Sequence, residues 1–503
     1  MKYRNPIISG FHPDPSICRA GEDYYLATSS FEYFPGIPIY HSRDLINWTH
    51  ISNAITRQDQ LPFEAAKASE GIWAPTIRYD NGVFYITATF SGKGNFIIYT
   101  SDPSGEWSDP VWTEMDGIDP SMLFDNGKMY YCANDCGSRW KLYKTEGISV
   151  AEMDPVTGKV LGEIKRVWEG TGGGWLEAPH IYHIGKWYYI LAAEGGTGTR
   201  HMEVAARSQS IWGPYENCPE NPVLTNRNDT TKQADCCGHA DLIEDSAGSW
   251  WFVHLGTRPY AQGKTPLGRE TFLTPVEWRD HWPLAAKKKA YIENECALNA
   301  EQSRIATREF LFQSHIWEPE WISVRGRQEK YVRRGNGHLV LSPSGTKLSD
   351  PEGIPSFVAV RQPDFECTTE IELDFTPEKD GDEAGLAVYL TPRNYYCLCK
   401  RRENGESYIV VHKHADDFWQ EIYRKEAAEG RLRFRIDANK ATYEFFYSIC
   451  DDTYVDAGAA LSKFVTTEVA DRCFTGTVIG VYAQADRETD AKAFIYSYKS
   501  YIM

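Results

Sequence analysis

A fivefold repeat in the first 280 residues places the strongest constraint on how this chain can fold. Each copy opens with a short polar or proline-containing turn, runs through alternating residues to a glycine, and ends in an aromatic stretch. Equivalent positions are Pro15, Pro75, Pro120, Pro179 and Ala240, which are separated by 60, 45, 59 and 61 residues. A strand, a glycine turn and a second strand make a hairpin. A spacing of about 40–50 residues, with extra length in loops, is typical of four-stranded propeller blades. The repeat therefore predicts a five-bladed β-propeller.

The outer strands of these blades are expected at residues 42–48, 101–107 and 208–212, downstream of three of the hairpins. In a propeller the innermost strand of each blade lines the central axis, so the residues that open the repeats should face one shared site. These residues are Asp14, the Trp73-Ala74 pair, Asp119, Glu177 and His239. Three carboxylates, an aromatic ring and a histidine are thus expected to converge.

The repeat ends near Trp282, and a different pattern follows. Residues 369–375, 384–390, 395–399, 408–412, 432–436 and 442–447 form short alternating or aromatic runs separated by turn residues. Such runs predict a β-sandwich. The fold class is therefore all-β, with a propeller over residues 1–290, a linker over 291–308 and a concanavalin-like jelly-roll sandwich over 309–503.

Charge and cysteine content limit the partners and the compartment. Fifty-three basic against 70 acidic residues give a net charge of −17, which repels phosphate backbones and anionic lipids, so neither nucleic acid nor membrane is an expected partner. No segment before Pro6 resembles a secretion signal, and the twelve cysteines lack paired zinc-site spacing. We expect reduced thiols and a cytoplasmic protein.

Carboxylates gathered in one site suit the hydrolysis of glycosidic bonds. Like charges in a partly desolvated site raise at least one pKa, so one group donates a proton near neutral pH while another acts as a base. Glycoside hydrolysis needs an acid to protonate the leaving oxygen and a base to activate water. A third carboxylate can orient the acid and tune its pKa.

Six motifs in order carry a resemblance to a known family. They are His12-Pro13-Asp14-Pro15-Ser16, Gly71-Ile72-Trp73-Ala74-Pro75, Gly117-Ile118-Asp119-Pro120-Ser121, Glu177-Ala178-Pro179-His180, Cys237-Gly238-His239-Ala240 and Pro266-Leu267-Gly268-Arg269-Glu270. Together they resemble glycoside hydrolase family 43, in particular its β-xylosidase and α-L-arabinofuranosidase branch. The similarity runs from Asn5 to about Trp282, with a weaker likeness to the branch's appended sandwich at 384–399 and 474–476.

The resemblance implies a five-bladed propeller that hydrolyses with inversion. It implies Asp14 as general base, Glu177 as general acid and Asp119 as the residue that holds and tunes the acid. It further implies that Arg269 binds sugar hydroxyls and that Phe31 and Trp73 form apolar walls. The inverting geometry places the catalytic carboxyls roughly 6.5–9.5 Å apart, with room for water. Phe474 is the aromatic residue that we expect the sandwich to contribute.

His239 would also lie at the sugar site, and in some members of the family the corresponding histidine is near an axial calcium ion. We expect that no cofactor or metal is required, with Ca²⁺ near His239 as the one candidate ion. Two departures from the family pattern concern the floor of the site: Ala178 follows Glu177 where glycine is more usual, and Cys236-Cys237 precedes Gly238.

The leading hypothesis is an exo-acting glycosidase that releases terminal β-D-xylosyl or α-L-arabinofuranosyl residues from xylan- or arabinoxylan-derived oligosaccharides. Xylosidase is placed ahead of a mainly α-L-arabinofuranosidase activity. The chain would act on a small oligosaccharide, as a monomer or a homo-oligomer. Two alternatives stay open: a non-catalytic carbohydrate-binding propeller, and a retaining hydrolase of the fructan-cleaving clan with carboxyls about 5–5.5 Å apart.

Overall fold

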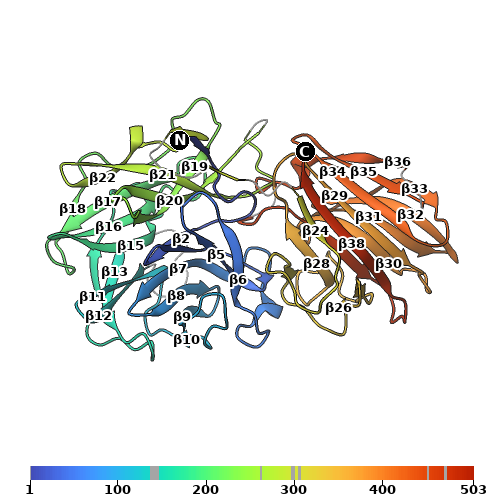
Figure 1. Ribbon diagram of the computed structural model, residues 1–503, viewed down its shortest axis with the longest axis horizontal. Coiled ribbons are helices and arrows are strands. Elements are labelled where there is room, and N and C mark those ends of the chain that lie inside the picture. Colours follow the sequence, from blue (N-terminus) through green and yellow to red (C-terminus); the bar gives the residue numbers. More distant parts are fainter. Residues whose placement is uncertain are drawn as a thin grey trace.

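The computed structural model describes residues 2–135, 147–260, 263–295, 301–303, 307–449, 453–469 and 473–503. Figure 1 shows a β-propeller, coloured blue to yellow-green, beside a β-sandwich in orange and red. The regular elements in these ranges are strands and three single 3₁₀ turns, η1 (Phe63–Ala65), η2 (Ala286–Lys288) and η3 (Ser462–Phe464). None of these turns is long and apolar enough to cross a membrane.

Five four-stranded antiparallel sheets form the propeller, as the repeat predicts. Blade 1 contains β2 (Ser16–Ala20), β3 (Asp23–Ala27), β5 (Gly36–Ser42) and β6 (Thr49–Ile55). Blade 2 contains β7 (Ile72–Asp80), β8 (Val83–Phe90), β9 (Gly94–Thr100) and β10 (Val111–Trp112). Blade 3 contains β11 (Ile118–Asp125), β12 (Lys128–Asn134), β13 (Ile148–Met153) and β14 (Lys165–Trp168). Blade 4 contains β15 (Glu177–Ile184), β16 (Trp187–Glu194), β17 (Met202–Ser208) and β18 (Glu216–Asn217). Blade 5 contains β19 (Asp235–Glu244), β20 (Trp250–Thr257), β21 (Glu270–Arg279) and β22 (Trp282–Ala285).

The first strands of the blades make the central ring. Strand β2 contacts β7, β7 contacts β11, β11 contacts β15, β15 contacts β19, and β19 returns to β2. The N-terminal segment ties this ring to blade 5: Asn5 donates to the Leu273 and Tyr291 carbonyls, and β1 (Lys2–Arg4) pairs with β23 (Glu293–Glu295). Residues 291–308, expected as a linker, thus contribute β23 to the propeller side and the start of β24 (Thr307–Phe310) to the sandwich.

The expected outer strands at 42–48, 101–107 and 208–212 are wrong. Apart from the ends of β5 and β17, these segments are turns, and the outer strands β6, β10 and β18 follow them. The side chain of Asp44 explains the first case, because it accepts hydrogen bonds from the backbone N–H groups of Ile46 and Asn47. Side-chain bonds of this kind favour a turn over an extended chain.

Two sheets form the sandwich. The larger one has the order β26-β27-β38-β29-β34-β35-β36, with β24 also paired to β38, and the other has the order β28-β37-β30-β31-β32-β33. The strands of the larger sheet are β26 (Val332–Gly335), β27 (His338–Leu341), β29 (Cys367–Phe375), β34 (Leu432–Ala438), β35 (Thr442–Ser448), β36 (Val455–Leu461) and β38 (Ala493–Ile502). Those of the six-stranded sheet are β28 (Ser356–Arg361), β30 (Glu383–Thr391), β31 (Asn394–Glu403), β32 (Glu406–Ala415), β33 (Phe418–Glu426) and β37 (Val478–Gln484). All six runs expected from the sequence lie within these strands.

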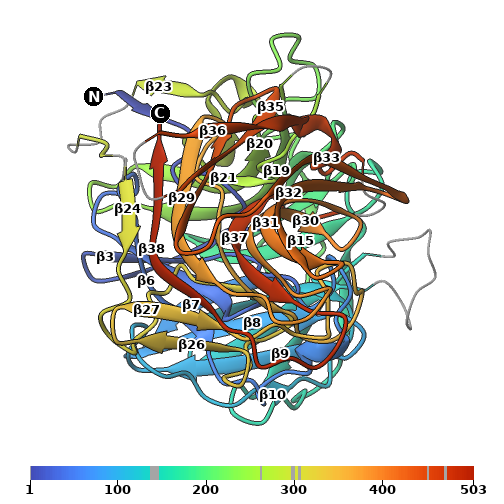
Figure 2. The same ribbon diagram turned by 90° about the vertical axis from the view of Figure 1, so that its right-hand side faces the viewer.

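The burial pattern shows which face of each sheet is covered. Strand β34 alternates between buried and half-buried residues, as expected for a strand with one face on the core. Every residue of β30 is buried, because one face of the six-stranded sheet packs in the sandwich core and the other packs on the propeller. In that second layer Phe11, Phe31 and Tyr33 meet Phe357 and Tyr389. A short pair between β4 (Tyr33–Phe34) and β25 (Ser323–Val324) also joins the two domains, which lie against each other in both views (Figures 1 and 2).

Candidate active site

One residue at the start of each blade has a left-handed backbone. The residues are Asp14 (φ 53°), Ala74 (φ 43°), Asp119 (φ 53°), Ala178 (φ 54°) and His239 (φ 53°). This conformation costs a non-glycine residue about 1–3 kcal/mol and is concentrated at functional sites. In blades 2 to 5 the pairing of the first two strands also shifts register at this point, and such bulges redirect side chains. The repeat positions inferred from the sequence are therefore equivalent in three dimensions.

The structure refines the place of Glu177 in this pattern. Ala178, not Glu177, is the counterpart of Asp14 and Asp119, and Glu177 precedes it by one residue, as Trp73 precedes Ala74. Glu177 is therefore the first residue of β15, the innermost strand of blade 4, and it lies on the N-terminal side of the bulge. This offset lets two carboxyl groups from neighbouring blades approach the same space.

Asp14 is buried between two donors. Its Oδ1 accepts a 2.8 Å hydrogen bond from Nη1 of Arg269, and its Oδ2 accepts a 2.6 Å bond from the Ser29 hydroxyl. The Nδ1 atom of His239 lies 3.5 Å from the same Oδ1. A cation and a hydroxyl fix both carboxylate oxygens, which is the arrangement a general base needs to be held in one orientation.

Asp119 and Glu177, both half-buried, lie next to the buried Asp14. Asp119 Oδ2 accepts a 3.2 Å hydrogen bond from the backbone N–H of Ala178, the residue after Glu177. Burial, followed by the negative charges of Asp119 and Asp14, raises the pKa of Glu177 to about 8, against the opposing charge of Arg269. Burial and the charge of Asp14 also raise the pKa of Asp119. Glu177 thus keeps its proton at neutral pH, the state that a general acid requires.

Arg269 connects Asp14 to the sandwich. Its Nη1 also donates to the Thr197 hydroxyl at 3.2 Å, and its Nη2 donates to the Phe474 carbonyl at 3.3 Å. The guanidinium carbon lies 5.7 Å from the centre of the Phe31 ring and 5.5 Å from that of Phe474. Its buried Nε has no hydrogen-bond partner among the described residues.

The aromatic residues come from both domains. The Phe31 and Phe474 rings are 6.0 Å apart, and Ser69 joins Phe474 to Trp73. The Ser69 carbonyl accepts a 3.0 Å bond from Trp73 Nε1, and the Ser69 hydroxyl accepts a 2.8 Å bond from the Phe474 N–H. All eight site residues inferred from the sequence are therefore linked by contacts or by mutual electrostatic effects.

Two glycines allow the sandwich to approach this closely. A Cβ atom on Gly268 would lie 2.7 Å from the Thr475 carbonyl oxygen, and one on Gly476 would lie 2.3 Å from the Leu267 carbonyl oxygen. Gly268 also has a φ of +71°, which a residue with a side chain rarely adopts. The turn that presents Arg269 thus packs backbone to backbone against the segment that presents Phe474.

The propeller axis beneath His239 is filled by a buried ion pair. Arg78 Nη1 donates to Asp241 Oδ2 at 2.8 Å, and Arg78 Nη2 lies 3.0 Å from His180 Nδ1. The Tyr182 hydroxyl donates to Asp241 Oδ1 at 2.6 Å. Burial and the nearby Arg269 lower the pKa of His239, against the raising effect of Asp14. The histidine is therefore neutral at neutral pH.

These neighbours do not fit a calcium ion near His239. Calcium takes six to eight oxygen ligands, whereas the contacts of His239 are the Asp14 carboxylate at 3.5 Å and the imidazole of His180. The Asp14 carboxylate is already paired with Arg269, so few free oxygen ligands face the ring.

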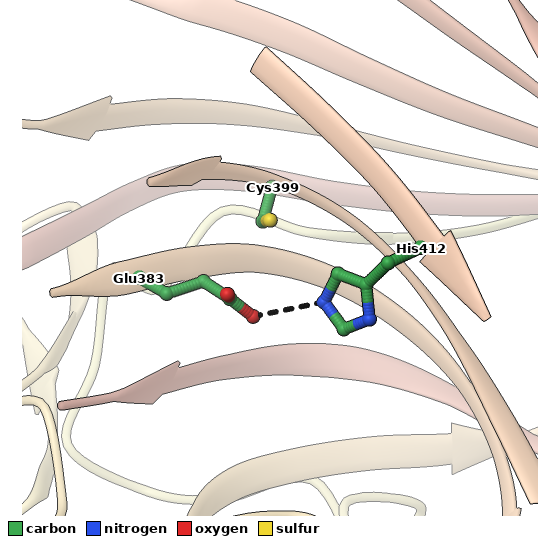
Figure 3. Close-up of side chains that lie close together, drawn as sticks. All are labelled: Glu383, Cys399 and His412. Atoms are coloured by element: carbon green, nitrogen blue, oxygen red, sulfur yellow. Dashed lines mark hydrogen bonds and ion pairs between the residues drawn. The ribbon is translucent and has the colours of Figure 1, made fainter. Parts of the chain in front are cut away.

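The described residues contain one group of three side chains with metal-ligand spacing, and it lies in the sandwich. Glu383, Cys399 and His412 have ligand atoms within 4.8 Å of one another (Figure 3). Glu383 is already paired with Arg401 and accepts a hydrogen bond from Tyr482. The carboxylate is thus neutralised by protein groups, and a buried ion-pair network accounts for the cluster.

Sequence reasoning missed the residues that hold the site together. Ser29 fixes Asp14, Thr197 binds Arg269, and Ser69 joins Trp73 to Phe474. Glu203, buried in β17, accepts a hydrogen bond from the Ala240 N–H and so supports the turn that carries His239. Ser29 lies two residues before Phe31, so its place near the site could have been inferred from Phe31. The bonds of Thr197 to Arg269 and of Ser69 to Phe474 join segments far apart in sequence.

Comparisons with known proteins agree with this geometry. Residues 3–283 match the family model described as glycosyl hydrolases family 43, and residues 310–501 match the beta xylosidase C-terminal concanavalin A-like domain. A non-reducing end alpha-L-arabinofuranosidase of Bacteroides ovatus is 38% identical over 97% of this chain and 92% of its own length. A beta-xylosidase of Bacillus subtilis is 32% identical over 96% of each chain. The solved structure of a xylan beta-1,4-xylosidase from Bacillus halodurans is similar with a TM-score of 0.93, at 29% identity over 99% of both chains.

Proposed function

Because the chain belongs to glycosyl hydrolase family 43, we propose that it is an exo-acting enzyme that removes terminal β-D-xylosyl or α-L-arabinofuranosyl residues from xylan- or arabinoxylan-derived oligosaccharides. The family hydrolyses with inversion. The observation that carries the proposal is the cluster of Asp14, Asp119 and Glu177, in which one carboxyl is bonded to a cation and another has a raised pKa.

The chemistry divides between two of these groups. Asp14 would accept a proton from a water molecule as the oxygen of that water attacks the anomeric carbon. Glu177 would donate its proton to the leaving oxygen as the glycosidic bond breaks. One water is consumed, the anomeric configuration inverts, and the two carboxyls end in exchanged protonation states. Proton exchange with solvent then restores both.

Asp119 and Arg269 would support these steps without transferring a proton. Asp119 accepts from Ala178 and raises the pKa of Glu177, so that it holds and tunes the acid. Arg269 orients Asp14 and, by the family resemblance, would bind a sugar hydroxyl. The Phe31 and Trp73 rings provide apolar surface of the kind that stacks on sugar faces. His239, neutral and beside Asp14, can donate or accept one hydrogen bond.

Exo action is supported by the sandwich. Phe474 lies against Phe31 and is hydrogen-bonded to Arg269 and Ser69, so the second domain occupies one side of the site. A polysaccharide that ran past that side would meet this contact. A single terminal sugar would not.

A direct assay measures whether the enzyme prefers β-D-xylosyl or α-L-arabinofuranosyl substrates. Hydrolysis of 4-nitrophenyl β-D-xyloside and of 4-nitrophenyl α-L-arabinofuranoside should be compared as kcat/KM on the same preparation, and we expect the xyloside to be the better substrate. A clear preference for the arabinofuranoside would favour the second candidate, a mainly α-L-arabinofuranosidase activity, which the 38% identical relative supports.

The non-catalytic alternative is tested with Asp14→Asn and Glu177→Gln. An enzyme loses turnover in both variants while it still binds sugar, whereas a binding module shows no turnover in the unaltered protein.

We also propose a cytoplasmic location, where the enzyme would act on short imported oligosaccharides. The nine cysteines among the described residues are all free, which suits a reducing compartment. Fractionation of the source cells followed by activity assay tests this location.

A further inference from the structure

A cavity of about 180 Å³ lies between blade 1 and the sandwich, away from the catalytic carboxyls. Tyr40 of β5 and His50 of β6 line it from the propeller, and Arg308 of β24 and Arg361 of β28 line it from the sandwich. Both domains therefore contribute polar walls to one space.

Arg361 is the unusual member of this wall. It is 5% exposed, and neither its Nε nor its Nη2 has a hydrogen-bond partner in the described part of the chain. The centre of the Phe11 ring lies 5.4 Å from the guanidinium carbon, but a ring face does not replace a hydrogen-bond acceptor for these N–H groups. Buried arginine side chains are normally paired with an anion, because an uncompensated charge is costly to bury.

None of the described residues pairs an anion with Arg361. Glu320 is the one acidic residue among those that line the cavity, and none of the ion pairs between described residues includes Arg361. Arg308 adds a second positive charge to the wall and lowers the pKa of the Arg361 guanidinium, together with burial. A local excess of positive charge in a protein of net charge −17 points to a ligand of opposite sign.

The two histidines that line the cavity, His12 and His50, have hydrogen-bond partners other than Arg361. His12 lies 3.0 Å from the Ser9 carbonyl through Nδ1, and its Nε2 lies 2.6 Å from the Tyr40 hydroxyl. His12 therefore donates from Nδ1 and accepts from Tyr40, which satisfies both side chains. The His50 ring stacks on Tyr40 at 4.7 Å, and its Nε2 lies 3.3 Å from Asn53 Oδ1. His12, Tyr40 and His50 thus form the propeller side of the cavity wall, and their hydrogen bonds are made within the propeller.

We propose that this cavity is a binding site for a small oxyanion, a phosphate or a carboxylate, held by the Arg361 guanidinium. Planar guanidinium groups bind such anions through two parallel N–H donors, and Nε and Nη2 of Arg361 are two neighbouring donors without a partner; both are buried in the cavity wall, so the side chain must shift for an anion to reach them. The bound anion would neutralise a charge on the sandwich at the point where the sandwich meets blade 1. It would thereby stabilise the domain contact that also holds Phe474 beside Arg269.

The test uses the full chain and two probes, inorganic phosphate and acetate, at constant ionic strength. Titration calorimetry and thermal unfolding are followed with each probe. We expect saturable binding of at least one of them and a rise in Tm with its concentration. The probe that binds more tightly identifies the class of oxyanion.

Arg361→Gln keeps a polar side chain but removes the charge and shortens it, and should weaken binding by about ten-fold or more. Arg333→Gln, which changes an exposed arginine of β26, should bind like the unaltered protein. If Arg361→Gln does not fold, Arg308→Gln at the half-buried second cation should still weaken binding several-fold. Absence of saturable binding of both probes, or equal affinity in the Arg361 or Arg308 variant and the unaltered protein, would overturn the proposal.

Discussion

The variant Asp119→Asn tests how the acid is tuned. It removes a negative charge next to Glu177 but keeps an oxygen that can accept from the Ala178 N–H. Because the charge of Asp119 raises the pKa of Glu177, its removal must lower that pKa. The alkaline limb of the pH profile, which reports loss of the acid's proton, should therefore move to lower pH.

The magnitude follows from the geometry. Asp119 bonds to the residue after Glu177, so we take roughly 8 Å as the separation of the two carboxyls. Two unit charges about 8 Å apart interact by roughly 2 kcal/mol at an effective dielectric constant of about 20, which corresponds to about 1.5 pKa units. The alkaline limb, near pH 8 in the unaltered enzyme, should fall by about one to two pH units.

The assay is kcat/KM for xylobiose from about pH 5 to pH 10, because kcat/KM reports the pKa values of the free enzyme. Xylobiose has a poor leaving group and so depends on the acid. Asp125→Asn, at the outer end of the same strand β11, is the matched control and should leave the limb in place. An unchanged or upward-shifted limb in Asp119→Asn would refute the reasoning.

Three further predictions concern the aromatic residue from the sandwich, the buried ion pair on the propeller axis and the need for calcium. Phe474→Ala should lower kcat/KM by about 10- to 100-fold through lost apolar contact, while Phe418→Ala, an exposed ring of the same domain, should change it little; equal effects would contradict the role of Phe474. Arg78→Met should lower the free energy of unfolding by about 3–5 kcal/mol in urea titrations, because it leaves buried Asp241 unpaired, and a loss below about 1 kcal/mol would argue against the axial pair. Treatment with EDTA should leave kcat unchanged, and a loss restored by Ca²⁺ would show that the axis holds the ion after all.

The repeat made the architecture and the catalytic carboxyls predictable. Five equivalent turns required five blades, and the blade axis then brought Asp14, Asp119 and Glu177 together although they are far apart in sequence. Phe474 was expected near the site only from the family resemblance, and the structure places it beside Phe31.

Other features depended on packing that no local pattern encodes. Arg78 and Asp241 are 163 residues apart and meet because their blades share the axis. The outer strands were misplaced because Asp44 favours a turn through its own side chain. The missing partner of Arg361 could not be anticipated, since an arginine near the end of a strand is usually paired or exposed.

The most direct test of the central claim compares Glu177→Gln with Asp14→Asn on two substrates, xylobiose and 2,4-dinitrophenyl β-D-xyloside. The dinitrophenyl group leaves without help from an acid. Glu177→Gln should therefore lose about 10²–10⁴-fold in kcat/KM on xylobiose but stay within about ten-fold of the unaltered enzyme on the aryl xyloside, whereas Asp14→Asn should lose activity on both. Equal losses on the two substrates in Glu177→Gln would contradict the assignment of Glu177 as the acid and Asp14 as the base.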